Sequence, residues 1–163
     1  MARNFIYQLN SKGYPSDWEI TPSDFYESDY VTAWCDYFYE AGDFDEEITA
    51  FSLFSELVEG ERFKDVVKID TEEKTITLYP GFKAVWFSHK FEQFEELVNA
   101  CTMDYFIDDL YAYRVRRLLG GSFDAFIQDD ADDSLQKMDA YFRNLCLDEP
   151  VTLRFGGFVG FHY

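Results

Sequence analysis

Carboxylates are the residues of this chain whose number and spacing are most suited to chemistry. From Gly13 to Glu61 the chain has fourteen Asp and Glu residues and no Lys, Arg or His. Carboxylates at this density can transfer protons, hold a divalent cation, or present negative charge to a basic partner. The 163-residue chain as a whole has a formal net charge of -18. Because unbalanced charge destabilises a compact fold, we infer that a positively charged partner, rather than stability, explains the acidic run.

Patterns for a metal site are incomplete. Neither His89 nor His162 has a Cys or Asp at the spacing of a structural zinc site. The acids in 129–133 partly match a calcium loop, but its sixth and twelfth positions would be Ser134 and Ala140. An EF-hand needs Gly and Glu there. We therefore expect no metal or other cofactor, and we interpret 129–133 as the solvated start of a helix.

Patterns for catalysis are also incomplete. The glycine-rich segment 156–160 is not followed by a helix whose N-terminus would receive a phosphate. The segment around Ser122 lacks the flanking pattern of a nucleophile elbow. With thirty-two acids, some pair of carboxylates always lies as close together as the two catalytic carboxylates of a glycosidase. Such a pair is therefore no evidence for hydrolytic activity. We expect no enzymatic activity.

The totals predict one folded domain. The hydrophobic fraction is 47% and the aromatic fraction 20%, whereas disordered acidic chains are poor in aromatics. The odd and widely separated cysteines Cys35, Cys101 and Cys146 argue against a disulfide framework. Neither a signal-peptide pattern nor an apolar run of membrane-spanning length is present. We expect a cytoplasmic protein.

Two consecutive helices are expected to position the acidic run. The first begins near Ser23 and stops at Gly42, and it places Asp36 and Glu40 one turn apart on its outer face. The second runs from about residue 45 to 59 and is apolar on two sides. Its second ridge either packs inside the domain or faces a partner, an alternative that the pattern leaves open. That ridge consists of Ala50, Leu53 and Leu57.

The remaining pattern predicts an α+β fold. An opening strand (3–9), a hairpin (63–69 and 74–79), a third strand (83–87) and a helix capped by Ser88 are expected. Two further helices (from 102 or 104 to 117, and 129–146) precede a final strand, which is kinked at its glycines and inserted in the sheet. The prediction is a single α+β domain, with a mixed or antiparallel sheet of four to five strands packed with about five helices.

Charge and size together suggest a function. Duplex DNA presents one charge per roughly 1.7 Å of axis, and two adjacent acidic helices approach that density. We predict an acidic inhibitor that binds the basic nucleic-acid-binding surface of a nuclease or defence complex, as antirestriction and anti-CRISPR mimics do. The alternatives are an immunity protein that neutralises a basic nuclease toxin, and an acidic adaptor or scaffold. Acids that recur in 92–96, 104–109, 124–133 and 148–149 favour the mimic.

The net charge of the chain determines which partners we expect. We expect a basic protein as the partner and no direct contact with nucleic acid or a membrane, because the net charge repels both. The oligomeric state does not follow from the sequence. The residues predicted to contact the partner are Asp29, Asp36, Tyr39, Glu40, Asp43, Asp45, Glu46, Glu47, Glu56 and Glu59.

Overall fold

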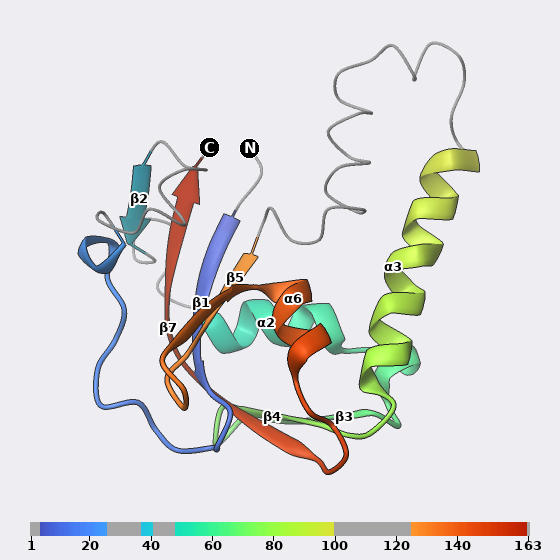
Figure 1. Cartoon of the computed structure of the whole chain (residues 1–163), viewed down its shortest axis with the longest axis horizontal. Coiled ribbons are helices and arrows are strands. Elements are labelled where there is room, and N and C mark those ends of the chain that lie inside the picture. Colours follow the sequence, from blue (N-terminus) through green and yellow to red (C-terminus); the bar gives the residue numbers. More distant parts are fainter. Residues whose placement is uncertain (1–3, 26–36, 41–47, 100–124, 163) are drawn as a thin grey trace.

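The computed structural model describes residues 4–25, 37–40, 48–99 and 125–162 (Figure 1). Seven strands and three α-helices lie in these ranges. The strands are β1 (Asn4–Asn10), β2 (Tyr37–Glu40), β3 (Val67–Asp70), β4 (Thr75–Leu78), β5 (Ala125–Asp129), β6 (Ser134–Lys137) and β7 (Val151–His162). The helices are α2 (Ala50–Val58), α3 (Phe82–Asn99) and α6 (Met138–Asn144), with 3-10 turns η1 (Pro22–Asp24) and η3 (Glu61–Phe63).

The strands form one mixed sheet in the order β3-β4-β7-β1-β5-β6, and β2 pairs with β7 beside this path. Strands β1 and β5 are parallel, whereas the other pairs are antiparallel. The predicted α+β class is therefore confirmed, while the predicted counts of strands and helices are not. The last strand is central, since β7 pairs with β4, β1 and β2, and its predicted insertion into the sheet is confirmed.

Each face of the sheet has its own apolar cluster. Alternate residues of β1, such as Tyr7 and Leu9, point to a large core shared with α2, α3 and α6. In that core the rings of Phe54 (α2), Phe82 (α3) and Phe142 (α6) are fully buried. The opposite face has a smaller cluster with η1 and β2, and its buried residues are Ile6, Ile20, Phe25, Phe38, Phe126, Val159 and Phe161. The domain therefore has a thick helical side and a thin side.

A β-bulge in β7 changes which residues face each cluster. Tyr7 pairs with Phe158 and Leu9 with Phe155, so Gly156 and Gly157 together lie opposite the single residue Gln8. Because of the extra residue, Phe155 and Phe158 both face the helical core. A side chain at position 156 would collide with Gln8, because an added Cβ would lie 2.8 Å from Gln8 Oε1. The kink that the sequence predicts at these glycines is confirmed.

Gly156→Ala is expected to lower the free energy of unfolding by about 1–3 kcal/mol, because the locked Gln8 side chain has to move. Urea unfolding measures the loss. Gly157→Ala is the matched control, since its Cβ would meet neighbours at 3.5 Å, an ordinary contact distance. We expect the control to lose less than about 1 kcal/mol. Equal losses in the two variants would contradict a steric role specific to Gly156.

Three predicted elements are wrong where the structure describes them. The helix from Ser23 to Gly42 is replaced at Tyr37–Glu40 by β2, because aromatic residues favour extended backbone that pairs with β7. Residues 83–87 are the first turns of α3 rather than a strand, and Ser88 lies inside that helix. The helix expected over 129–146 is reduced to α6. Its first half forms the end of β5, a turn with Asp133 at φ 51, and β6.

The remaining predictions are either confirmed in part or concern residues outside the described ranges. The hairpin forms with a shorter first strand, and the second helix begins later, at Ala50, where Thr49 caps it reciprocally with Ser52. Cys146 is exposed and has a free thiol. Cys35, Cys101 and the helix predicted to end at 117 lie outside the described residues. No helix in the described ranges has the length and apolar character needed to cross a membrane.

Candidate protein-interaction surface

The predicted contact residues fall into three groups. Glu56 and Glu59 are exposed, in the last turn of α2 and just after it. Tyr39 and Glu40 lie in β2, so the prediction that Glu40 stands on a helical ridge one turn from Asp36 is wrong. The others lie outside the described residues: Asp29, Asp36, Asp43, Asp45, Glu46 and Glu47.

The two-sided apolar pattern of the second helix has a clear explanation in the structure. Ala50 is fully buried and Leu53 packs against the helical core, whereas Leu57 is 40% exposed. Helix α2 lies on the sheet through Phe51, Phe54 and Val58. The ridge is therefore mainly structural, and Leu57 is the member that a partner can reach.

Carboxylates gather where α2, η3 and α3 meet. We call Glu56, Glu59, Glu61 and Glu92 the acidic corner. Phe63 packs its ring against Phe82 and Trp86 and so holds η3 on α3. Arg62 Nη1 pairs with Glu92 Oε2 at 2.5 Å, and Lys64 pairs with Glu61.

Four carboxylates near this junction have no counter-ion within the described part of the chain. Glu56 and Glu59 belong to the acidic corner, and Glu95 and Glu96 continue it one turn further along α3. All four are exposed, and none makes a hydrogen bond or ion pair with another described residue. As far as the described residues go, these carboxylates are open to a cationic partner.

Added salt is expected to stabilise the fold, because the uncompensated carboxylates repel one another. Raising NaCl from about 0.01 M to about 0.1 M shortens the screening length from about 30 Å to about 10 Å. We expect the melting temperature to rise by about 2–4 °C, equivalent to about 1 kcal/mol. Calorimetry measures the shift, and the double variant Glu56→Gln/Glu59→Gln should show a smaller one. A melting temperature independent of salt in both proteins would contradict the repulsion.

His89 is the titrating group beside the acidic corner. Its half-buried ring lies 6.2 Å from that of Phe63, and Nδ1 has no hydrogen-bond partner. Burial lowers the pKa of His89 below 6.5, and the positive charge of Arg62 lowers it further, against the opposite effect of Glu92. Protonation is thus costlier in the folded state than in the unfolded state. The stability that neutral His89 contributes is present above pH 6.5 and is lost as the pH falls from 6.5 through the lowered pKa of the folded state.

An NMR titration of the His89 ring protons is expected to give a midpoint below 6.5. In the variant Arg62→Gln the midpoint should rise, because a nearby positive charge is removed. A wild-type midpoint at or above 6.5 would contradict this account of the ring's surroundings.

A second exposed feature is the loop Ser11–Ile20, which we call the 11–20 loop. In Figure 1 it is the blue segment that leaves β1 and curves round to η1. Tyr14 is 66% exposed and Trp18 is 45% exposed, although large aromatic side chains usually pack inside. Ile20, at the end of the loop, is buried on the thin side of the sheet.

Gln8 holds the loop from beneath. Its side chain is fully buried in β1 and makes four hydrogen bonds. Nε2 donates to the Trp18 carbonyl oxygen at 3.0 Å and to Asp130 Oδ2 at 2.8 Å. Oε1 accepts from the backbone N–H groups of Ile20 at 3.2 Å and Gly157 at 3.0 Å. One side chain thus joins the loop, the bulge of β7 and the β5–β6 turn.

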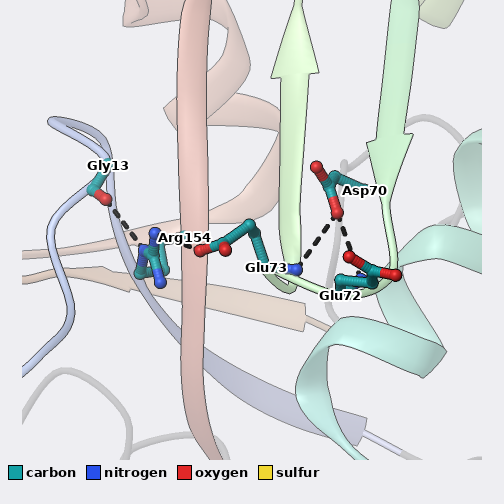
Figure 2. A network of polar contacts seen from close by, with 5 residues as sticks. All are labelled: Gly13, Asp70, Glu72, Glu73 and Arg154. Carbon is teal, nitrogen blue, oxygen red and sulfur yellow. Dashed lines mark hydrogen bonds and ion pairs between the residues drawn. The ribbon is translucent and has the colours of Figure 1, made fainter.

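Arg154 holds the start of the same loop (Figure 2). Its Nε donates to the Gly13 carbonyl oxygen at 2.9 Å, and its Nη2 pairs with Glu73 Oε2 at 3.0 Å. Asp70 Oδ1 accepts from the backbone N–H groups of Glu72 and Glu73 at 3.1 Å, which shapes the β3–β4 turn. The loop is therefore fixed to β7 and, through Arg154, to that turn.

Asp129 is a polar anchor that the sequence analysis missed. It was interpreted as part of a solvated helix start, but it ends β5 and is 2% exposed. Its Oδ1 accepts from the backbone N–H of Ser11 at 3.1 Å, and its Oδ2 from the Tyr141 hydroxyl at 2.9 Å. Burial and this neighbouring carboxylate raise the pKa of Tyr141. The apolar residues that precede Asp129 could have predicted a buried strand. Asp129 would then be the last residue of that strand and would be buried with it.

A cavity of about 430 Å³ opens beside the end of the 11–20 loop. Phe51, Phe155 and Phe158 supply its apolar lining, and Glu19 and Lys74 supply opposite charges. Within the described ranges, no three His, Cys, Asp or Glu side chains are grouped so as to hold a metal ion. The cavity lining combines apolar surface with one carboxylate and one ammonium group, and these two do not form an ion pair with each other.

No protein-family model, curated protein or solved structure matches this chain. Function is therefore inferred from the chemistry of its surface.

Proposed function

We propose that the protein is an acidic inhibitor that binds the basic nucleic-acid-binding surface of a nuclease or defence complex, as a nucleic-acid mimic of the antirestriction or anti-CRISPR type. The observation that carries the proposal is the set of exposed carboxylates that have no counter-ion among the described residues, Glu56, Glu59, Glu95 and Glu96. They belong to a chain with a net charge of -18. Such a surface attracts a basic partner at long range, and the attraction weakens as salt rises.

The positive side chains near this surface are already occupied. Arg62 pairs with Glu92, and Lys64 pairs with Glu61. Lys90 lies over the Trp86 ring, 5.2 Å from its centroid. Within the described ranges, these cations therefore leave Glu56, Glu59, Glu95 and Glu96 without compensation, which supports a cationic partner for them.

The distribution of acids favours a mimic over an immunity protein. Exposed acids also occur in the β3–β4 turn (Glu72 and Glu73), the β5–β6 turn (Asp132) and the segment before β7 (Asp148 and Glu149). An immunity protein needs one patch that matches one toxin, whereas an extended groove accepts charge on several sides. We retain the immunity protein and the acidic adaptor as alternatives that the experiment below separates.

The test is capture of binding proteins from a bacterial lysate at low salt, with mass spectrometry of the proteins that elute at high salt. We expect a basic nuclease or defence complex on the wild type. Glu56→Gln/Glu59→Gln should weaken binding about five- to tenfold and reduce its dependence on salt, as expected for two charges at an interface. Asp148→Asn/Glu149→Gln removes the same charge from the segment before β7 and should weaken binding less, which separates the acidic corner from the effect of net charge.

Three results would count against the proposal. Capture of a lone toxin would support the immunity alternative, and capture of a partner without a nucleic-acid-binding surface would support an adaptor. Unchanged binding by the folded Glu56→Gln/Glu59→Gln variant would show that the acidic corner is not the contact surface.

A further inference from the structure

We propose that the 11–20 loop is a preformed arginine-binding element, in which Tyr14 and Trp18 stack on guanidinium groups of the basic partner while Asp17 and Glu19 pair with them. This inference rests on the proposed function and assigns it a contact site outside the residues predicted from the sequence. The evidence is the exposure of the two rings, the fixed backbone beneath them and the charge around them.

The loop has anchors other than its exposed rings. Its anchors are Ile20, which is buried, and the polar contacts of its backbone with Gln8 and Arg154. In addition, Ser16 Oγ donates to Asp130 Oδ2 at 2.5 Å. Tyr14 and Trp18 keep 66% and 45% of their surface exposed above this base. Aromatic side chains held in this way are the preferred anchors of protein interfaces.

The fixed backbone lowers the cost of binding. The loop is held near its start at Gly13, at Ser16 in its middle, and at Trp18 and Ile20 near its end. A loop that is already ordered loses little conformational entropy when a partner binds. Tyr and Trp add large contact areas with few rotatable bonds.

The charge around the rings specifies the partner. Asp17 and Glu19 are exposed and have no counter-ion among the described residues. Apart from Lys12 near its start, the loop lies in the stretch from Gly13 to Glu61, which has no Lys, Arg or His. Arg154, the cation directly beneath, is occupied by Gly13 and Glu73. Within the described part of the chain, the loop therefore combines two exposed aromatic side chains with two exposed carboxylates at neighbouring sequence positions.

Arginine fits this combination better than lysine does. Its planar guanidinium stacks on an aromatic face and still donates two parallel hydrogen bonds to a carboxylate. Lysine is a compact, strongly hydrated charge that cannot do both. A surface of carboxylates alone retains only the bidentate part of this preference, so the signature of the loop is the share of the preference that depends on Tyr14 and Trp18.

The test compares octa-arginine with octa-lysine as probes, by calorimetry at low salt. We expect the wild type to bind octa-arginine about five- to tenfold more tightly. The double variant Tyr14→Ser/Trp18→Ser should lower this ratio to about twofold or less, while its affinity for octa-lysine stays within about twofold of the wild type. Leu57→Ser, which removes an exposed apolar side chain from α2, is the matched control and should keep the preference. Unchanged near-ultraviolet circular dichroism confirms that each variant is folded.

NMR gives a second readout. The indole N–H of Trp18 should shift with octa-arginine and much less with octa-lysine, whereas the buried Trp86 should not respond.

The possible failures are distinguishable. If both peptides bind equally and the loop variant changes nothing, the arginine-binding element is wrong while the acidic-surface proposal stands. If neither peptide binds the wild type at low salt, the proposed function fails and this inference fails with it.

Discussion

Gln8→Leu is expected to lower the free energy of unfolding by about 3–5 kcal/mol, measured by urea denaturation. Gln8 is fully buried, and leucine preserves its approximate volume but none of its four hydrogen bonds. The N–H groups of Ile20 and Gly157 would then lack their acceptor. Each buried group left without a partner costs about 1–3 kcal/mol.

The matched control lies on the neighbouring strand. Gln128 pairs in register with Gln8, is also buried, and makes a single long hydrogen bond of 3.4 Å to Asp133. We expect Gln128→Leu to cost less than about 1.5 kcal/mol, because little is lost with that bond. If the two variants lose the same stability, Gln8 is not the polar centre that joins the loop to the sheet.

Phe142→Ala is expected to lower the free energy of unfolding by about 3–5 kcal/mol. Phe142 is fully buried at the point where all three helices meet. Its ring centroid lies 5.1 Å from that of Phe82, 5.0 Å from that of Trp86 and 5.9 Å from that of Phe54. Alanine would leave a cavity between α2, α3 and α6 that rigid aromatic neighbours cannot fill. Thermal and urea unfolding both measure the loss.

Phe91→Ala is the control for this cavity. Phe91 lies on α3 and is 60% exposed, so its removal should change the free energy of unfolding by less than about 0.5 kcal/mol. A large loss at Phe91 would show that the face of α3 on which it lies is buried against another surface in solution. A loss below about 1 kcal/mol at Phe142 would contradict the packing of the three helices.

The sequence pattern predicted correctly those elements whose residues all favour the same secondary structure. Strand β1, the β3–β4 hairpin and the core of α2 follow from period and turn residues. The final strand and its kink follow from an apolar run interrupted by glycines, and the bulge opposite Gln8 confirms this interpretation.

The wrong predictions concern segments whose secondary structure depends on the part of the chain against which they pack. Lys83–Phe87 has few residues, and such short runs fit a strand or a helix equally well until neighbouring segments are known. The backbone N–H of Phe82 donates to the Tyr79 carbonyl at 3.0 Å in the turn that begins α3. Similarly, 125–129 becomes a strand because β1 lies parallel to it, a pairing between residues more than a hundred positions apart.

The candidate surface was predictable in charge but not in shape. The exposed acids Glu56 and Glu59 could be predicted, because they lie in and just after an amphipathic helix that the sequence expects to stop before Gly60. The 11–20 loop could not, because the exposure of Tyr14 and Trp18 depends on Gln8 and Arg154, which hold the backbone from distant strands. A buried glutamine opposite a glycine pair has no local sequence signature.

The central claim is that the acidic surface occupies a site that otherwise binds nucleic acid. Its most direct test is displacement at constant ionic strength. Protein captured on the immobilised wild type is challenged with short duplex DNA or RNA, or with the same charge concentration of polyglutamate. We predict that nucleic acid releases the captured protein in a concentration-dependent way and that polyglutamate is at least about tenfold less effective. Retention of the partner in saturating nucleic acid would contradict the account, because the two would then occupy different surfaces.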